Sequence, residues 1–314
     1  DLPQDGRIDP NATPCGKGVR VSTFPTVYGE KAVVRILDTK PDLFHLDVLG
    51  FRKEISDGLR SIVGRPHGTL LLTGPSSSGK TTTIYALLRH LMTSRETPPH
   101  IVTLEDPVEY RLGRIAQSEI SPAAGFTFGA ALRAVVRQDP EVIMVGEIRD
   151  PETAHIAIQA GLTGHLVIST IHSGAAAAVF TRLLDMGIEP FLIASSVTGV
   201  LAQRLVRVNC PNCLAPYQPH AAFLGRFGLG EDTVGFRGGT GCAQCRGIGY
   251  VGRTPIGELL LVNEEIADRI LARARTSDLH AAALHNGMRT LEQDGLDKVR
   301  RGTTTLEELA RVVG

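Results

Sequence analysis

Continuous apolar runs alternate with amphipathic segments through the middle of the chain. Four runs, TLLLTG, IVTLED, EVIMVG and HLVIST, are bounded by turn-forming or charged residues. Such runs are typical of strands buried on both faces of a parallel sheet. Segments with helical spacing lie between them, including TTTIYALLRHLM and PETAHIAIQAGL. The alternation over residues 51–205 therefore predicts an α/β core.

The pattern before this core is different. Residues 19–37 alternate apolar and polar side chains in two runs around a turn containing Pro25 and Gly29, which predicts a β-hairpin. The residues before the hairpin show neither a helical nor a strand period, and residues 39–50 also lose periodicity. We therefore expect a separate N-terminal unit at residues 1–37 and an interdomain linker at 38–50.

The pattern changes again after the core. Glycine, proline and cysteine become dense over residues 206–252, which predicts a small module held by its cysteines because it cannot build an apolar core. The run GRTPIGELLLV then allows one more strand, and the remaining sequence has helical spacing. We expect a C-terminal strand and a helical subdomain at residues 253–314.

Composition limits the possible classes of protein. A chain of 314 residues with 42% hydrophobic content can form two or three packed units. Lysine plus arginine balance aspartate plus glutamate at 33 each, so no net field draws the chain to nucleic acid or to an anionic bilayer. The sequence has no apolar run of about 18 residues and no signal-peptide pattern. We expect an intracellular chain that begins inside a longer protein, because its first residue is not Met.

A phosphate-binding motif follows the first core strand. The segment LLLTGPSSSGKTTT matches G-x-x-x-x-G-K-[ST] between a predicted strand and a predicted helix. Backbone N–H groups of such a loop turn onto phosphate oxygens, and the helix adds its positive end. We expect Lys80 to reach the β- and γ-phosphates of ATP and the Thr81 hydroxyl to bind Mg²⁺. The residues expected to contact the nucleotide are Gly74, Pro75, Ser76, Ser77, Ser78, Gly79, Lys80, Thr81, Thr82 and Glu105.

Hydrolysis also needs a group that orients or activates water. The run VIMVGEIRD ends in an acid, as a Walker B strand does, but Gly146 stands where the aspartate is usual, so we predict Glu147 as the general base. The carboxylate that holds Mg²⁺ must then come from elsewhere. Glu105, Asp106 and Glu109 are the candidates, because ligands of α/β proteins bind at the carboxyl ends of strands. A solvated acidic turn is the alternative interpretation.

Two histidines bracket the segment TGHLVISTIHS. Either histidine alone is more often a structural residue, because imidazole readily forms hydrogen bonds in protein cores. His172 stands at the end of the predicted strand, where it can sense the γ-phosphate, and His165 stands at the beginning. We therefore rank His172 above His165 as a candidate site residue.

Four of the five cysteines form two C-x2-C pairs with 28 residues between them. A disulfide clip, a redox centre and a metal site are the possibilities, and an intracellular setting disfavours the disulfide. Tetrahedral thiolate ligation favours Zn²⁺, with reduced, metal-free thiols as the alternative. The expected zinc ligands are Cys210, Cys213, Cys242 and Cys245. Cys15 remains as an unpaired thiol.

The order of these motifs resembles that of the secretion ATPase superfamily, which drives type II secretion and type IV pilus assembly. Residues 103–109 resemble the family's Asp box, 137–149 its Walker B region and 163–173 its His box. The His box departs from the family at Ser173 and Gly174, where Thr and Asn are common. The motifs that carry the resemblance are GPSSSGKTTT, TLEDPVEY, RQDPEVIMVGEIRD, TGHLVISTIHS, QRLVR and the split cysteines.

The resemblance implies a RecA-like core, a mobile N-terminal domain on a linker and a hexameric ring. Residues 1–37 would be the tail of that N2-type domain, from which Arg20 and Arg35 would reach the nucleotide phosphates. Lys31 stands where a further arginine is common. The resemblance also implies a cytoplasmic protein recruited to the inner membrane by platform proteins, which the preceding part of the chain would contact.

Within the superfamily the cysteines indicate an assembly motor, because retraction ATPases lack the four-cysteine module. The segment LEQDGLDKVRRGTTTLEELARV is more similar to the type II secretion branch than to the pilus extension branch. A type IV pilus extension ATPase remains the first alternative. A RecA-like nucleic-acid translocase and a nucleotide-binding scaffold without turnover are further alternatives, although 5% aromatic content argues against the translocase.

Overall fold

Two compact units make up the chain in the computed structural model, which describes residues 2–9, 12–13, 17–37, 44–230 and 232–314. The smaller unit comprises Asp1–Asp42 with Val108–Arg111, and the larger comprises Leu43–Pro107 with Leu112–Gly314. Cys15 and the first residues of the predicted linker, 38–43, lie outside the described residues.

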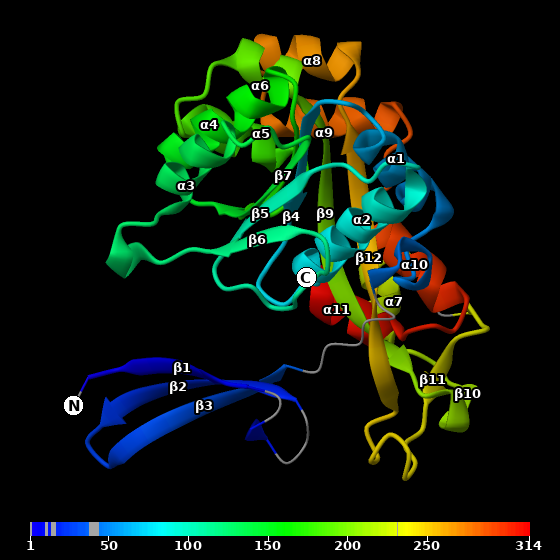
Figure 1. Cartoon of the computed structure of the whole chain (residues 1–314). Helices are drawn as coiled ribbons and strands as arrows, with labels where there is room; N and C mark the ends of the chain where they lie inside the picture. The colour runs from blue at the N-terminus through cyan, green and yellow to red at the C-terminus, as the bar shows by residue number, and fades with distance from the viewer. Residues whose placement is uncertain (1, 10–11, 14–16, 38–43, 231) are drawn as a thin grey trace. The chain divides into compact units, whose positions relative to one another are not determined.

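The smaller unit contains a three-stranded antiparallel sheet. The predicted hairpin is confirmed as β2 (Gly18–Thr26) and β3 (Gly29–Leu37), with Pro25 inside β2 opposite Glu30 rather than in the turn. A further strand, β1 (Gln4–Ile8), pairs with β2, so the order is β1-β2-β3 (Figure 1). β1 was not predicted from the sequence. The segment QDGRI is exposed along its whole length and has no apolar alternation to reveal a strand.

A seven-stranded sheet forms the centre of the larger unit, in the order β12-β9-β4-β8-β7-β5-β6. All neighbouring pairs are parallel except β12 with β9, which confirms the predicted α/β class with a parallel sheet. The four predicted core strands are all present, as β4, β5, β7 and β8. The strands are β4 (Gly68–Thr73), β5 (Ile101–Glu105), β6 (Ala116–Glu119), β7 (Val142–Ile148), β8 (Leu166–Ile171), β9 (Val197–Asn209) and β12 (Tyr250–Leu261).

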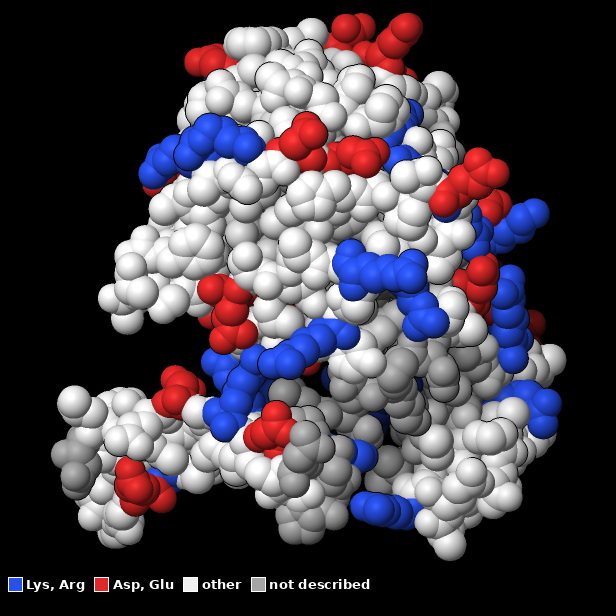
Figure 2. Space-filling view, viewed as in Figure 1, with Lys and Arg blue, Asp and Glu red and all other residues white. Residues whose placement is uncertain are grey.

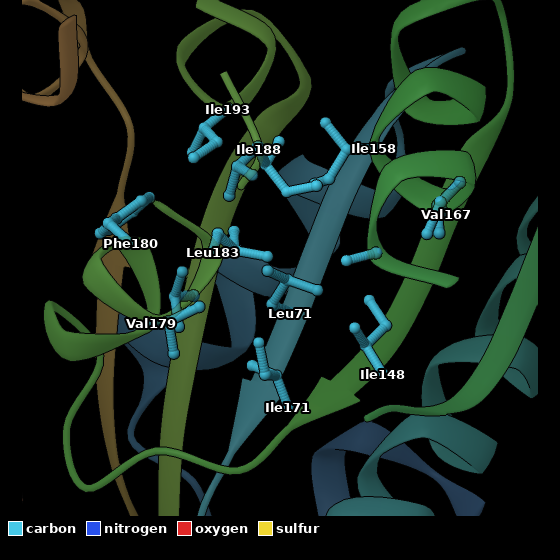
Figure 3. Close-up of a cluster of buried hydrophobic side chains, with 14 of the residues drawn as sticks. Leu71, Ile148, Ile158, Val167, Ile171, Val179, Phe180, Leu183, Ile188 and Ile193 are labelled. Atoms are coloured by element: carbon cyan, nitrogen blue, oxygen red, sulfur yellow. The ribbon is translucent and has the colours of Figure 1, made fainter. Parts of the chain in front are cut away.

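Helices cover both faces of this sheet (Figure 1). A large apolar cluster combines the sheet with helices that include α3 to α6, and it contains Leu71, Val167 and Phe180 (Figure 3). Because β4 is buried along its whole length, neither of its faces reaches solvent, which explains its continuous apolar sequence. The helices around the sheet are α1 (Lys53–Val63), α2 (Lys80–Ser94), α3 (Phe128–Val135), α4 (Pro151–Leu162), α5 (Ala178–Asp185) and α6 (Pro190–Ser196), with short 3-10 turns at Leu46–Val48 and Pro122–Ala124.

The C-terminal third is continuous with the sheet. The predicted boundary after residue 205 falls inside β9, and the boundary after residue 252 falls inside β12, which pairs with β9. The remaining elements are a 3-10 turn at Pro211–Cys213, β10 (Leu214–Pro216), α7 (Ala221–Arg226), β11 (Arg237–Gly239), α8 (Glu264–Leu271), α9 (Thr276–His285), α10 (Leu291–Arg300) and α11 (Leu306–Val313).

The cysteine-containing segment shares an apolar core with the C-terminal helices. Leu224, Phe227 and Phe236 are buried in one cluster with Val299 and Leu309. The expectation that this segment has no apolar core was therefore wrong. Its few large apolar residues are spaced without a period, and partners for them come from helices more than 60 residues later in the chain.

Charge is mixed over the surface. Figure 2 shows lysine and arginine side chains interspersed with acidic ones over the visible face of the larger unit, as the balanced composition leads one to expect. Within the described part of the chain, no helix combines the length and the apolar character needed to cross a bilayer.

A buried carboxylate joins the last helix to the sheet. Glu308 in α11 is 1% exposed and accepts hydrogen bonds from Arg311 at 2.7 and 2.8 Å and from Arg207 of β9 at 2.8 and 2.9 Å. Burial by itself would raise the pKa of Glu308, but the bonds from Arg311 and Arg207 outweigh burial and lower the pKa from 4.5 to about 2. Glu308 therefore stabilises the fold only while it is ionised.

We predict that Glu308→Gln lowers the free energy of unfolding by about 2–3 kcal/mol at pH 7, because a folded-state pKa below the unfolded value stabilises the ionised form. That stabilisation is fully present above about pH 4.5 and is lost as the pH falls toward 2. Urea unfolding of both proteins between pH 7 and pH 2 measures the difference, which should narrow over that window. The exposed Glu292→Gln variant is the control and should follow wild type. A wild-type advantage that does not narrow with acid would contradict the prediction.

Candidate functional site

The phosphate-binding motif forms a loop between the end of β4 at Thr73 and the start of α2 at Lys80. Gly74 and Gly79 have positive φ angles of 149° and 89°, which favour glycine. The Lys80 ammonium donates to the backbone carbonyl oxygens of Gly74 at 2.8 Å and Pro75 at 3.0 Å. Burial lowers the pKa of Lys80, the charge of Glu147 opposes this shift, and the charge of Arg204 adds to it.

The other predicted loop residues differ in exposure. Pro75, Ser76 and Ser77 are exposed, whereas Ser78 is buried. Thr81 and Thr82 lie half-buried in the first turn of α2. The loop therefore presents its backbone and the helix N-terminus together, as phosphate binding requires.

A buried glutamine on the neighbouring strand holds this loop. Gln203 of β9 is 1% exposed, donates from Nε2 to the Ser78 carbonyl oxygen at 2.8 Å and accepts from the Thr83 hydroxyl at 2.9 Å. A Cβ at Gly74 would lie 2.4 Å from the Gln203 carbonyl oxygen, so this position has room only for glycine. Motif reasoning missed the role of Gln203, because QRLVR shows no local chemistry until β9 lies beside the loop.

Glu147 lies at the carboxyl end of β7, where the strand carries an extra residue. Val145 pairs with Ser169 and Ile148 with Ile171, so β7 has one more residue than β8 over this interval. Ser169 and Thr170 donate from their hydroxyls to the carbonyl oxygens of Val145 and Gly146, both at 2.7 Å. A bulge of this kind redirects side chains and often lies next to active sites.

The Glu147 carboxylate is bound on both oxygens. His172 Nε2 lies 2.7 Å from Oε1, and Arg149 Nε donates to Oε2 at 2.7 Å. Arg149 also lies 3.9 Å from the Asp106 carboxylate. The predicted base, the predicted γ-phosphate sensor and one candidate magnesium ligand are therefore in one network. Arg149 is the member that sequence reasoning did not single out.

Glu105 ends β5 and is 3% exposed. Its carboxylate accepts hydrogen bonds from the Tyr85 hydroxyl, from Thr103 at 2.6 Å and from Gln117 at 3.0 Å. Tyr85 belongs to α2, so the helix that starts at Lys80 also holds this acid in place. A Cβ at Gly146 would lie 3.5 Å from the Glu105 Cα and 3.1 Å from the Leu104 carbonyl oxygen, which leaves little space for an aspartate side chain.

The remaining polar candidates lie elsewhere. Glu109 belongs to the smaller unit, whereas Glu105 and Asp106 belong to the larger one. His165 directly precedes β8, at the end opposite His172, with its Nδ1 3.2 Å from the Ala160 carbonyl oxygen. Ser173 is tied to the end of β4, because its N–H donates to the Thr73 hydroxyl and its carbonyl accepts from that hydroxyl, both at 2.9 Å.

The two predicted N-terminal arginines lie side by side in the smaller unit. Arg20 of β2 is directly opposite Arg35 of β3 and also directly opposite Arg7 of β1. Three arginines therefore share one face of this sheet in a single row. Like charges in such positions repel, so the row favours an anionic ligand. Arg7 was missed because β1 itself was not predicted.

The four paired cysteines come together. Their sulfur atoms all lie within 4.8 Å of one another, with distances of 3.8 Å for Cys210 to Cys242, 3.9 Å for Cys213 to Cys245 and 3.7 Å for Cys242 to Cys245. Zn–S bonds of about 2.3 Å place the sulfurs of a tetrahedral site about 3.8 Å apart. The observed spacing therefore fits a zinc ion and is far too long for disulfides.

Hydrogen-bond donors surround these sulfurs. The Gly241 N–H donates to Cys213, the Cys242 and Gly249 N–H groups donate to Cys245, and the Asn212 amide donates to Cys242. The Asn212 amide, as the largest influence, lowers the pKa of Cys242, whereas burial raises the pKa of Cys213. Such donors favour thiolates, which are the form that binds metal.

Known proteins are similar to this chain in sequence and in fold. A family model described as Type II/IV secretion system protein matches residues 1–311. The Vibrio cholerae Type II secretion system ATPase E is 47% identical over 99% of this chain and 61% of its own length, and the Type II secretion system protein E of Dickeya dadantii is 46% identical over 99% and 61%. The Thermus thermophilus Type IV pilus assembly ATPase PilB is 46% identical over 99% and 35%. The chain thus spans about three fifths of the two secretion relatives and about a third of the pilus relative.

Solved structures agree on the fold. The pilus retraction motor PilT with bound ADP has a TM-score of 0.71 and 25% identity, covering 99% of this chain and 77% of that one. The Legionella pneumophila ATPase DotB has a TM-score of 0.69 and 19% identity, covering 98% and 76%. With the family model matching nearly the whole chain, this protein belongs to the Type II/IV secretion system protein family.

Proposed function

We propose that this chain is the motor portion of a type II secretion ATPase, which hydrolyses ATP to drive pseudopilus assembly and protein export. The observation that carries the proposal is the placement of Glu147 between His172 and Arg149, with its charge acting on Lys80 of the phosphate-binding loop. The relatives named for type II secretion in Vibrio cholerae and Dickeya dadantii support the choice of system.

Each part of the site has a role in this proposal. The loop from Gly74 to Gly79 holds the phosphates on its backbone N–H groups, and Lys80 binds the β- and γ-phosphates. Glu147 accepts the proton of the attacking water, and His172 orients the Glu147 carboxylate.

The metal ligands follow from the same geometry. Thr81 and a carboxylate at the end of β5 would hold Mg²⁺, which neutralises charge on the phosphates when bound. Glu105 is the better placed of the two acids there, because three donors fix its orientation. The oxygen ligands of these side chains are of the kind that Mg²⁺ prefers.

The row of arginines in the smaller unit would supply further positive charge. Arg20 and Arg35 would contact the nucleotide phosphates, as the resemblance to the secretion ATPase superfamily implies. Arg7 lies beside them in the same row. A guanidinium stabilises the charge that develops on the transferred phosphoryl group. A homo-hexamer would bring such groups to several sites at once.

The cellular location of the motor follows from the proposed type II secretion system. The motor would act on the cytoplasmic face of the inner membrane, recruited peripherally by platform proteins. The four cysteines would hold a structural Zn²⁺, since all four ligand positions of a tetrahedral site are filled by thiolates and none is open for catalysis.

A type IV pilus extension ATPase is the second candidate, favoured by the 46% identity to the Thermus thermophilus relative. Deletion of the gene in its host separates the two. The proposed function predicts loss of protein export with normal pili. Loss of pili with normal export would support the second candidate instead. The mixed surface charge in Figure 2 gives no support to a nucleic-acid translocase.

Substitution of the proposed base gives the first test of the chemistry. We expect Glu147→Gln to lower kcat for ATP hydrolysis by about 10²-fold or more, because general acid–base groups contribute roughly that much. Nucleotide affinity should stay near the wild-type value. Steady-state ATPase assays and nucleotide titrations measure the two quantities.

The matched control is Glu141→Gln. Glu141 lies just before β7, at the opposite end of the strand from Glu147, where its carboxylate accepts from the His100 N–H. This variant should keep wild-type turnover. Equal turnover in wild type and Glu147→Gln would rule out Glu147 as the base.

The cysteine cluster is tested by metal content. We expect about one zinc ion per purified chain, and we expect Cys242→Ser to lose most of it because a tetrahedral thiolate site needs four ligands. Elemental analysis measures the metal, and thermal unfolding should show a lower Tm for the variant. Cys15→Ser serves as the control and should retain zinc. Full zinc content in Cys242→Ser, or none in wild type, would contradict the assignment.

A further inference from the structure

Arg204 of β9 lies against the phosphate-binding loop. The last pair between β4 and β9 joins Thr73 to Ala202, so the two residues after Ala202 run alongside the start of the loop. A Cβ built at Gly74 would lie 3.2 Å from Arg204 Nη1, which places the guanidinium directly beside the first glycine of the motif. Lys80 donates to the carbonyl oxygen of the same glycine at 2.8 Å. Two cations therefore converge on Gly74.

Backbone acceptors hold the guanidinium in this position. Nη1 donates to the Gln203 carbonyl oxygen and Nη2 to the Gly174 carbonyl oxygen, both at 3.1 Å. A guanidinium has five N–H donors, so these two bonds leave three for another ligand. The side chain is half-buried, which keeps one side open to solvent.

A buried acid balances part of the charge. Glu258 of β12 is 4% exposed, accepts from the Ala176 N–H at 3.2 Å and interacts electrostatically with Arg204. Arg204 and Lys80 are close enough that the charge of the arginine lowers the pKa of the lysine. Two neighbouring cations repel, and a polyphosphate between them removes that repulsion.

The position of Arg204 favours the γ-phosphate over the β-phosphate as its ligand. Gly174 follows His172 by two residues, and His172 contacts Glu147. Arg204 therefore approaches the loop from the side that carries the proposed base. A γ-phosphate must face that side for water to attack it, whereas the β-phosphate lies over the loop and the start of α2.

We propose that Arg204 is a ligand of the ATP γ-phosphate, supplied by the same chain that supplies the phosphate-binding loop. This inference rests on the proposed function, because it needs a bound nucleoside triphosphate. Through its bond to Gly174, Arg204 also links the presence of the γ-phosphate to the loop that follows His172. It adds a cation from the larger unit to those expected from Arg20 and Arg35 of the smaller one.

The test compares the affinities of the 314-residue chain for Mg²⁺-ADP and for the Mg²⁺ complex of a non-hydrolysable ATP analogue. We expect R204Q to weaken binding of the ATP analogue by about tenfold or more, since hydrogen bonds to charged groups have about that strength. Affinity for ADP should stay within about twofold of wild type. R204K, which keeps the charge, should recover part of the loss.

Arg207 provides the matched control on the same strand. It pairs with Glu308 and lies over the Tyr250 ring, so its described partners lie away from the phosphate-binding loop. R207Q should leave both affinities unchanged. If R204Q loses affinity equally for ADP and the ATP analogue, or loses affinity for neither, the inference is overturned. The proposed function would not be contradicted by either result.

Two other outcomes are also decisive. If R204Q does not fold, as thermal unfolding would show, R204K takes its place. A loss in R204K confined to the ATP analogue supports the inference, and an equal loss or no loss overturns it. Failure of wild type to bind either nucleotide would instead contradict the proposed function itself.

Discussion

The parallel pairing of β4 with β8 on one side and β9 on the other is the constraint on which the rest of the site depends. β4 leads directly into the phosphate-binding loop, so whatever follows its two neighbours lies beside that loop. On the β9 side, Gln203 joins Ser78 to Thr83 and fixes the loop to the first turns of α2. Each such neutral hydrogen bond contributes about 1 kcal/mol, and a buried group left unpaired costs more.

Beyond β8 the sheet positions the acids. The extra residue in β7 turns Glu147 toward His172, and the hydroxyls of Ser169 and Thr170 satisfy the carbonyl oxygens that the bulge displaces. The close approach of β5 to β7 at Gly146 leaves little room for a Walker B aspartate. Glu105, on β5 itself, is held there by donors from three different elements or loops. Gly146 thus replaces the usual Walker B aspartate, and the adjoining strand β5 holds an acid, Glu105, in a fixed position.

The C-terminal third depends on the same sheet. β9 continues past the phosphate-binding loop to the cysteine cluster, and β12 returns antiparallel to it. The segment between them is held from two directions, by its cysteines and by an apolar cluster shared with the last helices. The ion pairs of Glu308 add a polar link between β9 and α11. The continuous strand β9 thus connects the phosphate-binding loop to the cysteine cluster.

The sequence by itself determined the α/β class, the core strands, the hairpin, the phosphate-binding loop and the four cysteines, because each leaves a local pattern in residue type or spacing. β1 left none, since its five residues are exposed, and neither did the shared C-terminal core. Only the tertiary structure decided that Gln203 and Arg204 lie at the loop, that Arg149 joins Glu147, and that Arg7 lies beside Arg20. The physical reason is that these roles depend on strand order and register, which bring together residues far apart in the chain.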